Sequence, residues 1–131
     1  MPIQTLKLAD DLFPDVLAER KTNTICSGHR EIETRLVFEP TSGKELLDDD
    51  GDPYISVLVK VESVKHCLFR ELTLEDLQRE GITTSEATFV QDLQNFLDGM
   101  RRFYPDMTMD SPVTVINFEF LRRVVNYTRP C

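Results

Sequence analysis

The stretch YISVLVKVESVKHCLF, residues Tyr54–Phe69, decides the fold class because it is the clearest strand-forming sequence in the chain. Valine and isoleucine are concentrated in its first half, and β-branched side chains favour extended structure. A typical strand has only about five or six residues. We therefore expect this segment to bend, or to cross from one part of a barrel to another.

Four other segments have strand patterns, with alternating or β-branched residues: Ile3–Leu8, Thr22–Cys26, Thr34–Pro40 and Ser111–Leu121. Helical patterns lie between these strands. The resulting order, β-α-β-β-β-α-α-β, predicts an α+β domain with a mostly antiparallel, barrel-like sheet. A doubly wound parallel sheet fits this order less well.

The last two predicted helices follow the long strand. In LTLEDLQREG we expect a short helix with Thr73 as its N-cap and Gly81 just beyond its end. Thr83 and Glu86 have the spacing of a capping box, and the strongest amphipathic pattern of the chain follows them.

The length of 131 residues predicts one domain. We expect an ordered domain over 1–121 and a solvated basic tail over 122–131, with Arg122, Arg123 and Arg129. The chain has three cysteines, too few for a disulfide framework, and neither a secretory signal nor a membrane-spanning segment is visible. These features predict a cytoplasmic protein without a membrane partner.

The net charge of −8 argues against a broad grip on duplex nucleic acid, which requires neutralisation of phosphates. A small pocket for one nucleoside remains compatible with this charge. The acidic run Asp48–Asp52 invites a calcium-binding interpretation, but EF-hand spacing would place Leu46 and Val57 at ligand positions. We therefore predict a hairpin loop there and no metal site.

A junction between a helix and a strand holds the main chemical candidates, in RKTNTICSG. The helix is expected to begin near Asp11 or Leu12 and to run to about Lys21. A threonine such as Thr24 becomes a nucleophile only if a base takes its proton, and a lysine can be that base beside a cation such as Arg20. The alternative is structural: a helix-terminal charge and a sheet residue.

Other candidates are weaker. Cys26 and His29 have the spacing of a thiolate–imidazole pair, but a buried cysteine more commonly serves as a small apolar residue. An aromatic side chain such as Tyr54, Phe69 or Tyr104 can stack on a base, although core packing is the expected role of each.

Three blocks of the chain together resemble one known family: VLAERKTNTICSG, FRELTLEDLQREGIT and MRRFYPDMTMDSPVTVINFEFL. In this order they resemble the ASCH domain superfamily, which has a PUA-like fold, and in particular the small bacterial N4-acetylcytidine amidohydrolases. The likeness covers most of the chain, from Ile3 to Leu121.

The resemblance implies hydrolysis of the N4-acetyl amide of acetylated cytidine or a related acylated nucleoside. Lys21 would be the base, Thr24 the nucleophile and Glu80 the acid, with Glu75 and Asp76 as rivals for the acid. No metal or organic cofactor is implied.

The resemblance also implies substrate-binding positions at Arg20 and Cys26. Family members often carry an arginine where this chain has Cys26, and a glycine where it has Glu19. The thiol cannot supply the bidentate hydrogen bonding of an arginine. The alternative function is a non-catalytic module that binds RNA or a modified base, with Arg20, Lys21 and Thr24 in contact with it. A ribonuclease is disfavoured by the acidic charge balance.

Overall fold

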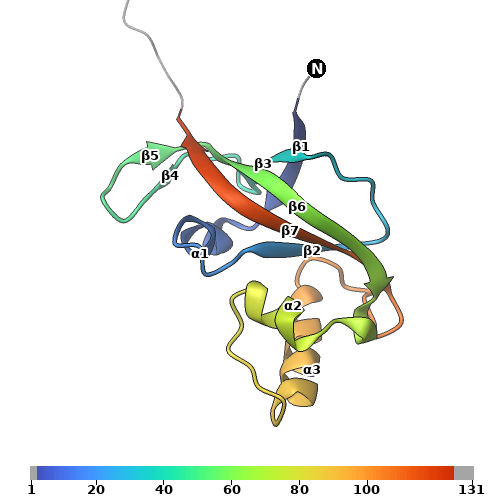
Figure 1. Cartoon of the computed structure of the whole chain (residues 1–131). Coiled ribbons are helices and arrows are strands. Elements are labelled where there is room, and N and C mark those ends of the chain that lie inside the picture. Colours follow the sequence, from blue (N-terminus) through green and yellow to red (C-terminus); the bar gives the residue numbers. More distant parts are fainter. Residues whose placement is uncertain (1–2, 126–131) are drawn as a thin grey trace, which may run out of the picture.

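A computed structural model describes residues 3–125, so Arg129 and Cys131 lie outside the described part of the chain. Its main element is a five-stranded mixed sheet that curls into a half-barrel, with the strand order β1-β3-β6-β7-β2 (Figure 1). The strands are β1 (Gln4–Leu8), β2 (Asn23–Ser27), β3 (Arg35–Pro40), β6 (Ser56–Leu68) and β7 (Pro112–Val124).

The long strand of the sequence is confirmed as β6. It pairs antiparallel with β3 along its first residues and with β7 along nearly its whole length. Its pairing with β7 shifts between Leu58 and Val59 and again between Val61 and Ser63. Such irregularities bend a strand, which accounts for the curl of the sheet. Among the strands of residues 3–125, β1 and β3 are the one pair that runs parallel.

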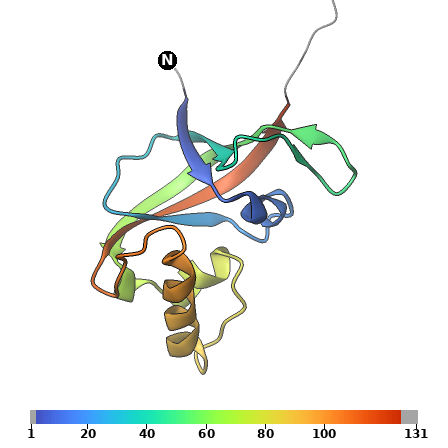
Figure 2. The ribbon, with the colours of Figure 1, turned by 180° about the vertical axis from the view of Figure 1, so that it is seen from behind.

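Two apolar cores lie on opposite faces of the sheet, because neighbouring side chains of a strand point to opposite sides. On β7, Ile116 and Phe118 belong to the core inside the curl, where the rings of Phe118 and Phe38 are 5.1 Å apart. Val113 and Val115 of the same strand belong to the second core, beneath the helices. Figures 1 and 2 place α1 and the pair α2/α3 on opposite sides of β2.

The first helical segment is shorter than predicted. A 3₁₀ turn, η1 (Asp10–Leu12), leads into α1 (Phe13–Leu17), so the helix ends before Lys21. Glu19 has φ +59°, a left-handed conformation that a helix cannot contain, and the amides of Arg20 and Lys21 both donate to the Asp15 carbonyl. Lys21 therefore lies in the connection that leads to β2.

The later helices are η2 (Phe69–Glu71), α2 (Leu74–Arg79) and α3 (Phe89–Met100). The predicted N-cap of α2 is confirmed, because the Thr73 hydroxyl accepts the Asp76 amide. The predicted Thr83–Glu86 capping box was wrong: α3 begins later, after a turn in which Thr88 donates from its hydroxyl to Asp92, 2.7 Å away.

The predicted hairpin over the acidic run is confirmed as β4 (Leu46–Leu47) paired with β5 (Pro53–Tyr54). The last strand extends three residues beyond Leu121, so Arg122 and Arg123 lie within β7. Among residues 3–125, no helix has the length and apolar character needed to cross a membrane.

Candidate functional site

A buried ion pair joins two distant parts of the chain. Lys21 Nζ lies 2.6 Å from Glu80 Oε2, and the two side chains are only 1% and 10% exposed. Lys21 follows the turn after α1, and Glu80 caps the C-terminus of α2. Burial raises the pKa of Glu80, while the charge of Lys21 acts in the opposite direction. A paired, desolvated carboxyl group of this kind is typical of functional sites.

A cleft of about 300 Å³ opens beside this pair. It lies where the curl of the sheet brings β1 and β2, its two edge strands, towards each other. Its volume is at the lower end of the range of about 300–1,000 Å³ for small-molecule sites. Its lining is mostly apolar and includes Leu8, Ala9, Leu12, Ile25, Cys26 and Met100, with Lys7, Thr24, Thr41 and Glu80 as polar members.

Thr24 and Glu80 both line this cleft, and Lys21 contacts it only through Glu80. Thr24 is 7% exposed, and its hydroxyl makes no hydrogen bond to any residue within 3–125. The fold thus brings Lys21 to Glu80 and brings Glu80 to the cleft of Thr24. The catalytic roles of the three residues remain predictions.

The two other carboxylates considered for the acid role, Glu75 and Asp76, do not contact Lys21. Glu75 is exposed on α2. Asp76 is buried, but its carboxylate lies 2.5 Å from Lys65 Nζ and accepts the Thr73 amide at 2.9 Å. Asp76 therefore anchors the start of α2 to β6, and Glu80 is the one of the three carboxylates that contacts Lys21.

The two predicted substrate-binding residues differ in position. The Arg20 side chain is 63% exposed, bonds Asp15 at 2.9 Å and does not line the cleft. Cys26 does line it, and burial raises the pKa of its thiol. His29 is exposed and lies against His66, with ring centroids 5.0 Å apart, so the structure does not form a Cys26–His29 pair.

The outer edge of β2 carries a backbone amide that points away from β7. Phe118 donates to the Thr22 carbonyl at 2.9 Å, and Gly28 donates to the Pro112 carbonyl at 2.8 Å. Because bonded and non-bonded residue pairs alternate in antiparallel strands, the even-numbered residues of β2 bond β7. The amide of Ile25, a cleft residue, therefore points away from β7.

Aromatic side chains from the turn that follows α3 form another wall of the cleft. Phe103 and Tyr104 line it, whereas Tyr54 and Phe69 are fully buried in the two cores. Tyr104 is thus the one predicted stacking candidate that reaches the cleft. Phe103 was missed, because helical spacing alone cannot separate a core residue from one at the rim of a cleft.

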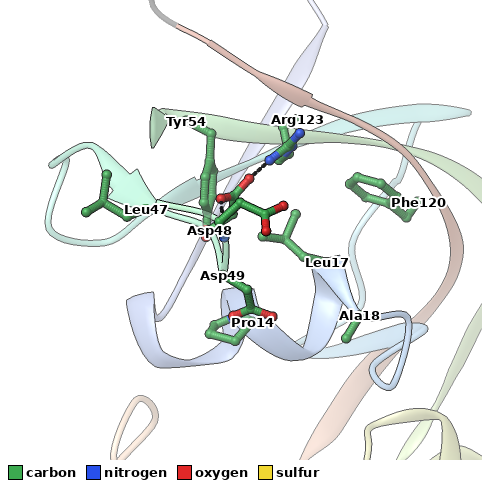
Figure 3. Close-up of a pocket in the computed structure, with 10 residues that line it drawn as sticks. Pro14, Leu17, Ala18, Leu47, Asp48, Asp49, Tyr54, Phe120 and Arg123 are labelled. Atoms are coloured by element: carbon green, nitrogen blue, oxygen red, sulfur yellow. Dashed lines mark hydrogen bonds and ion pairs between the residues drawn. The ribbon is translucent and has the colours of Figure 1, made fainter. Parts of the chain in front are cut away.

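A second cavity, of about 350 Å³, lies between α1 and the β4–β5 hairpin and contains none of the predicted catalytic or substrate-binding residues (Figure 3). On its wall the carboxylate of Asp48 forms an ion pair with Arg123 and accepts the amides of Asp50 and Asp52. The carboxylates of Asp48, Asp50 and Asp52 are clustered within 4.8 Å. The guanidinium of Arg123 supplies a positive charge to this cluster.

No family model and no curated protein matches the chain. Solved structures do match it. A protein of Enterococcus faecalis from the family DUF984 has a TM-score of 0.58 and 14% identity, over 99% of this chain and 88% of that one. An ASCH domain from Lactobacillus crispatus has a TM-score of 0.55 and 15% identity, over 90% and 79%.

A mutant form of an ASCH protein from Zymomonas mobilis is similar as well, with a TM-score of 0.54 and 11% identity over 96% of this chain and 82% of that one. The chain therefore has the ASCH-domain fold, which agrees with the family that its sequence resembles. Identities this low establish the fold alone.

Proposed function

We propose that the protein hydrolyses the N4-acetyl amide of acetylated cytidine or of a related acylated nucleoside. The observation that carries this proposal is the buried Lys21–Glu80 pair at a cleft that Thr24 also lines. Transfer of one proton along the 2.6 Å contact converts the ion pair into a neutral amine and a neutral carboxylic acid. A general base and a general acid arise together in this way, and burial raises the pKa of the Glu80 acid.

In the proposed reaction, the substrate turns the Lys21 amine from Glu80 towards the Thr24 hydroxyl and the amine accepts its proton. The Thr24 oxygen attacks the acetyl carbon and forms an ester, while the bond from that carbon to the exocyclic nitrogen breaks. Glu80 donates its proton to the departing nitrogen. Water then attacks the ester, which releases acetate and restores Thr24.

Two further groups have suitable positions for this reaction. The Ile25 amide at the open edge of β2 is a donor for the oxyanion that forms on the acetyl group. The Gly28 amide is not available for this role, because it already donates to the Pro112 carbonyl. Phe103 and Tyr104 line the cleft and are the candidates to stack on the base.

The test is an assay in which chromatography measures the release of cytidine from N4-acetylcytidine. Thr24→Val removes the nucleophile at nearly constant shape, and Glu80→Gln removes the acid. We expect each to reduce kcat by at least about 100-fold. Thr34→Val, which removes an exposed hydroxyl outside the cleft, should retain the wild-type rate.

Mass spectrometry of a quenched reaction should find the acetyl group on the peptide that contains Thr24. A folded wild-type protein that binds acetylated RNA or nucleoside but releases no acetate would instead be a binding module. Turnover that survives Thr24→Val would refute the nucleophile assignment while leaving the hydrolase activity intact.

A further inference from the structure

The segment before β2 and the end of α2 are joined by three hydrogen bonds between Thr22 and Arg79. The Thr22 amide donates to the Arg79 carbonyl at 2.6 Å. In return, Arg79 Nε donates to Thr22 Oγ1 at 3.0 Å, and Arg79 Nη2 donates to the Thr22 carbonyl at 3.3 Å. These two residues directly adjoin Lys21 and Glu80 in the sequence, so the two pairs are side by side.

The neighbouring ion pair needs such a connection, because neither of its members lies inside a regular element. Lys21 is in the connection between α1 and β2, and Glu80 is the C-cap of α2. Arg79 also reaches Glu62 of β6, with Nη2 3.1 Å from a carboxylate oxygen. Its planar guanidinium thus holds the end of α2 against β6 and against the segment before β2.

We propose that Arg79 and Thr22 are positioning residues that set the Lys21–Glu80 separation. We call the three hydrogen bonds between Thr22 and Arg79 the clamp. This inference rests on the proposed function for its catalytic meaning, since the clamp fixes the distance over which the proton moves between Lys21 and Glu80. Neither Arg79 nor Thr22 lines the cleft, so both act through the ion pair and not through contact with substrate.

The clamp has a measurable electrostatic consequence at Glu80. The groups that interact electrostatically with this carboxyl are the Lys21 ammonium and the Cys26 thiol of β2, and Lys7 and Tyr104 are the other titratable residues that line the same cleft. Lys21 is the only one of them that touches it. If the clamp loosens while the site stays buried, Glu80 loses that contact, and desolvation then raises its pKa further.

The experiment compares Thr22→Val, which keeps the shape but loses the acceptor oxygen, with Thr22→Ser, which keeps the oxygen. Arg79→Lys removes the fork but keeps the charge. Titration of the Glu80 carboxyl by carbon NMR should give a higher pKa in Thr22→Val and Arg79→Lys than in wild type, and a wild-type value in Thr22→Ser. Arg70→Lys, at an exposed arginine that pairs with Asp110, is the matched control and should leave the titration unchanged.

Kinetics on N4-acetylcytidine provide a second reading. After correction for the folded fraction, Thr22→Val and Arg79→Lys should reduce kcat about 10-fold or more with KM nearly unchanged, since small misplacements of reacting groups cost about 100-fold. The high-pH limb of the plot of kcat against pH should move to higher pH, in step with the pKa of Glu80. A merely structural role would lower the folded fraction and leave this limb in place.

The two proposals fail in different ways. An unchanged Glu80 titration in Thr22→Val and Arg79→Lys overturns the clamp, whether or not the protein is a hydrolase. Absence of turnover in wild type overturns the proposed function, and the NMR titration still decides whether Thr22 and Arg79 hold the pair together.

Discussion

Lys21 Nζ and Glu80 Oε2 are 2.6 Å apart although 59 positions separate the two residues in the sequence. Both side chains are almost completely removed from water, and the desolvation of two charges offsets much of their attraction. Such a pair contributes little net stability compared with apolar residues of the same size. Net stability alone therefore does not account for its position beside a cleft.

Removal of one partner should therefore cost more than removal of both. Lys21→Met leaves the Glu80 carboxyl buried without its cation, and we expect a loss of about 3 kcal/mol in the free energy of unfolding at pH 7. The double variant Lys21→Met with Glu80→Gln should lose less than Lys21→Met alone. Urea unfolding measures both.

A matched surface pair provides the control for this cycle. Lys7 and Glu39 are 3.3 Å apart, and both are well exposed. Lys7→Met should change the free energy of unfolding by less than about 1 kcal/mol. Strictly additive losses at Lys21 and Glu80 would contradict the coupling that their contact implies.

The raised pKa of Glu80 predicts the direction of a pH effect on stability. Below the ordinary carboxyl value of 4.5, the folded and unfolded states both hold the proton. As the pH rises from there through the raised pKa, the unfolded state releases its proton first, and the stability contributed by the buried neutral acid is lost. Wild type should therefore lose stability relative to Glu80→Gln across this interval.

Chemical unfolding of wild type and Glu80→Gln at a series of pH values tests this prediction. Subtraction of the two free energies of unfolding removes the effects of the other carboxylates, which both proteins share. If wild type instead gains stability relative to Glu80→Gln as the pH rises, the pKa of Glu80 is lowered in the folded state. That result would show that the Lys21 charge outweighs desolvation.

Two glycines should respond to alanine with opposite signs. Gly81 has φ +94°, and a Cβ there would lie 3.4 Å from the Arg20 carbonyl oxygen, where the two site segments approach each other. Gly81→Ala should cost about 1–2 kcal/mol. Gly99 is helical with open space around it, so Gly99→Ala should gain about 0.5 kcal/mol. Thermal unfolding separates the two signs, and a neutral Gly81→Ala would contradict this account.

The left-handed residue before the Arg20-Lys21 pair offers a stabilising change. Glu19 has φ +59°, which glycine adopts without the steric cost that a side chain brings. Glu19→Gly should raise the free energy of unfolding by about 0.5–1 kcal/mol, after allowance for the greater freedom of the unfolded chain. Glu31→Gly, at an exposed loop position without positive φ, should not stabilise.

Much of the fold was predictable because its signals are local. The β-branched content of Tyr54–Phe69 predicted β6, and the threonine before the helical pattern predicted the cap of α2. Helix ends were less predictable. The helix was expected to run to about Lys21, but α1 ends at Leu17, before the left-handed turn at Glu19.

The candidate site was predictable only in part. The family resemblance selected Lys21, Thr24 and Glu80, and the contact between Lys21 and Glu80 fits that selection. Spacing alone pointed to no particular carboxylate. It also gave no sign that Arg20 would turn to solvent, or that Arg79 would bond Thr22.

The sequence by itself determined which segments become strands and helices, and which side chains share a face of each, because these depend on residues a few positions apart. Only the tertiary structure decided that the end of α2 meets the connection before β2, and that the open edge of β2 faces a cleft. The physical reason is that the relative placement of distant segments is set by the joint burial of apolar surface on both faces of the curled sheet. Residue spacing within one segment carries no information about that placement.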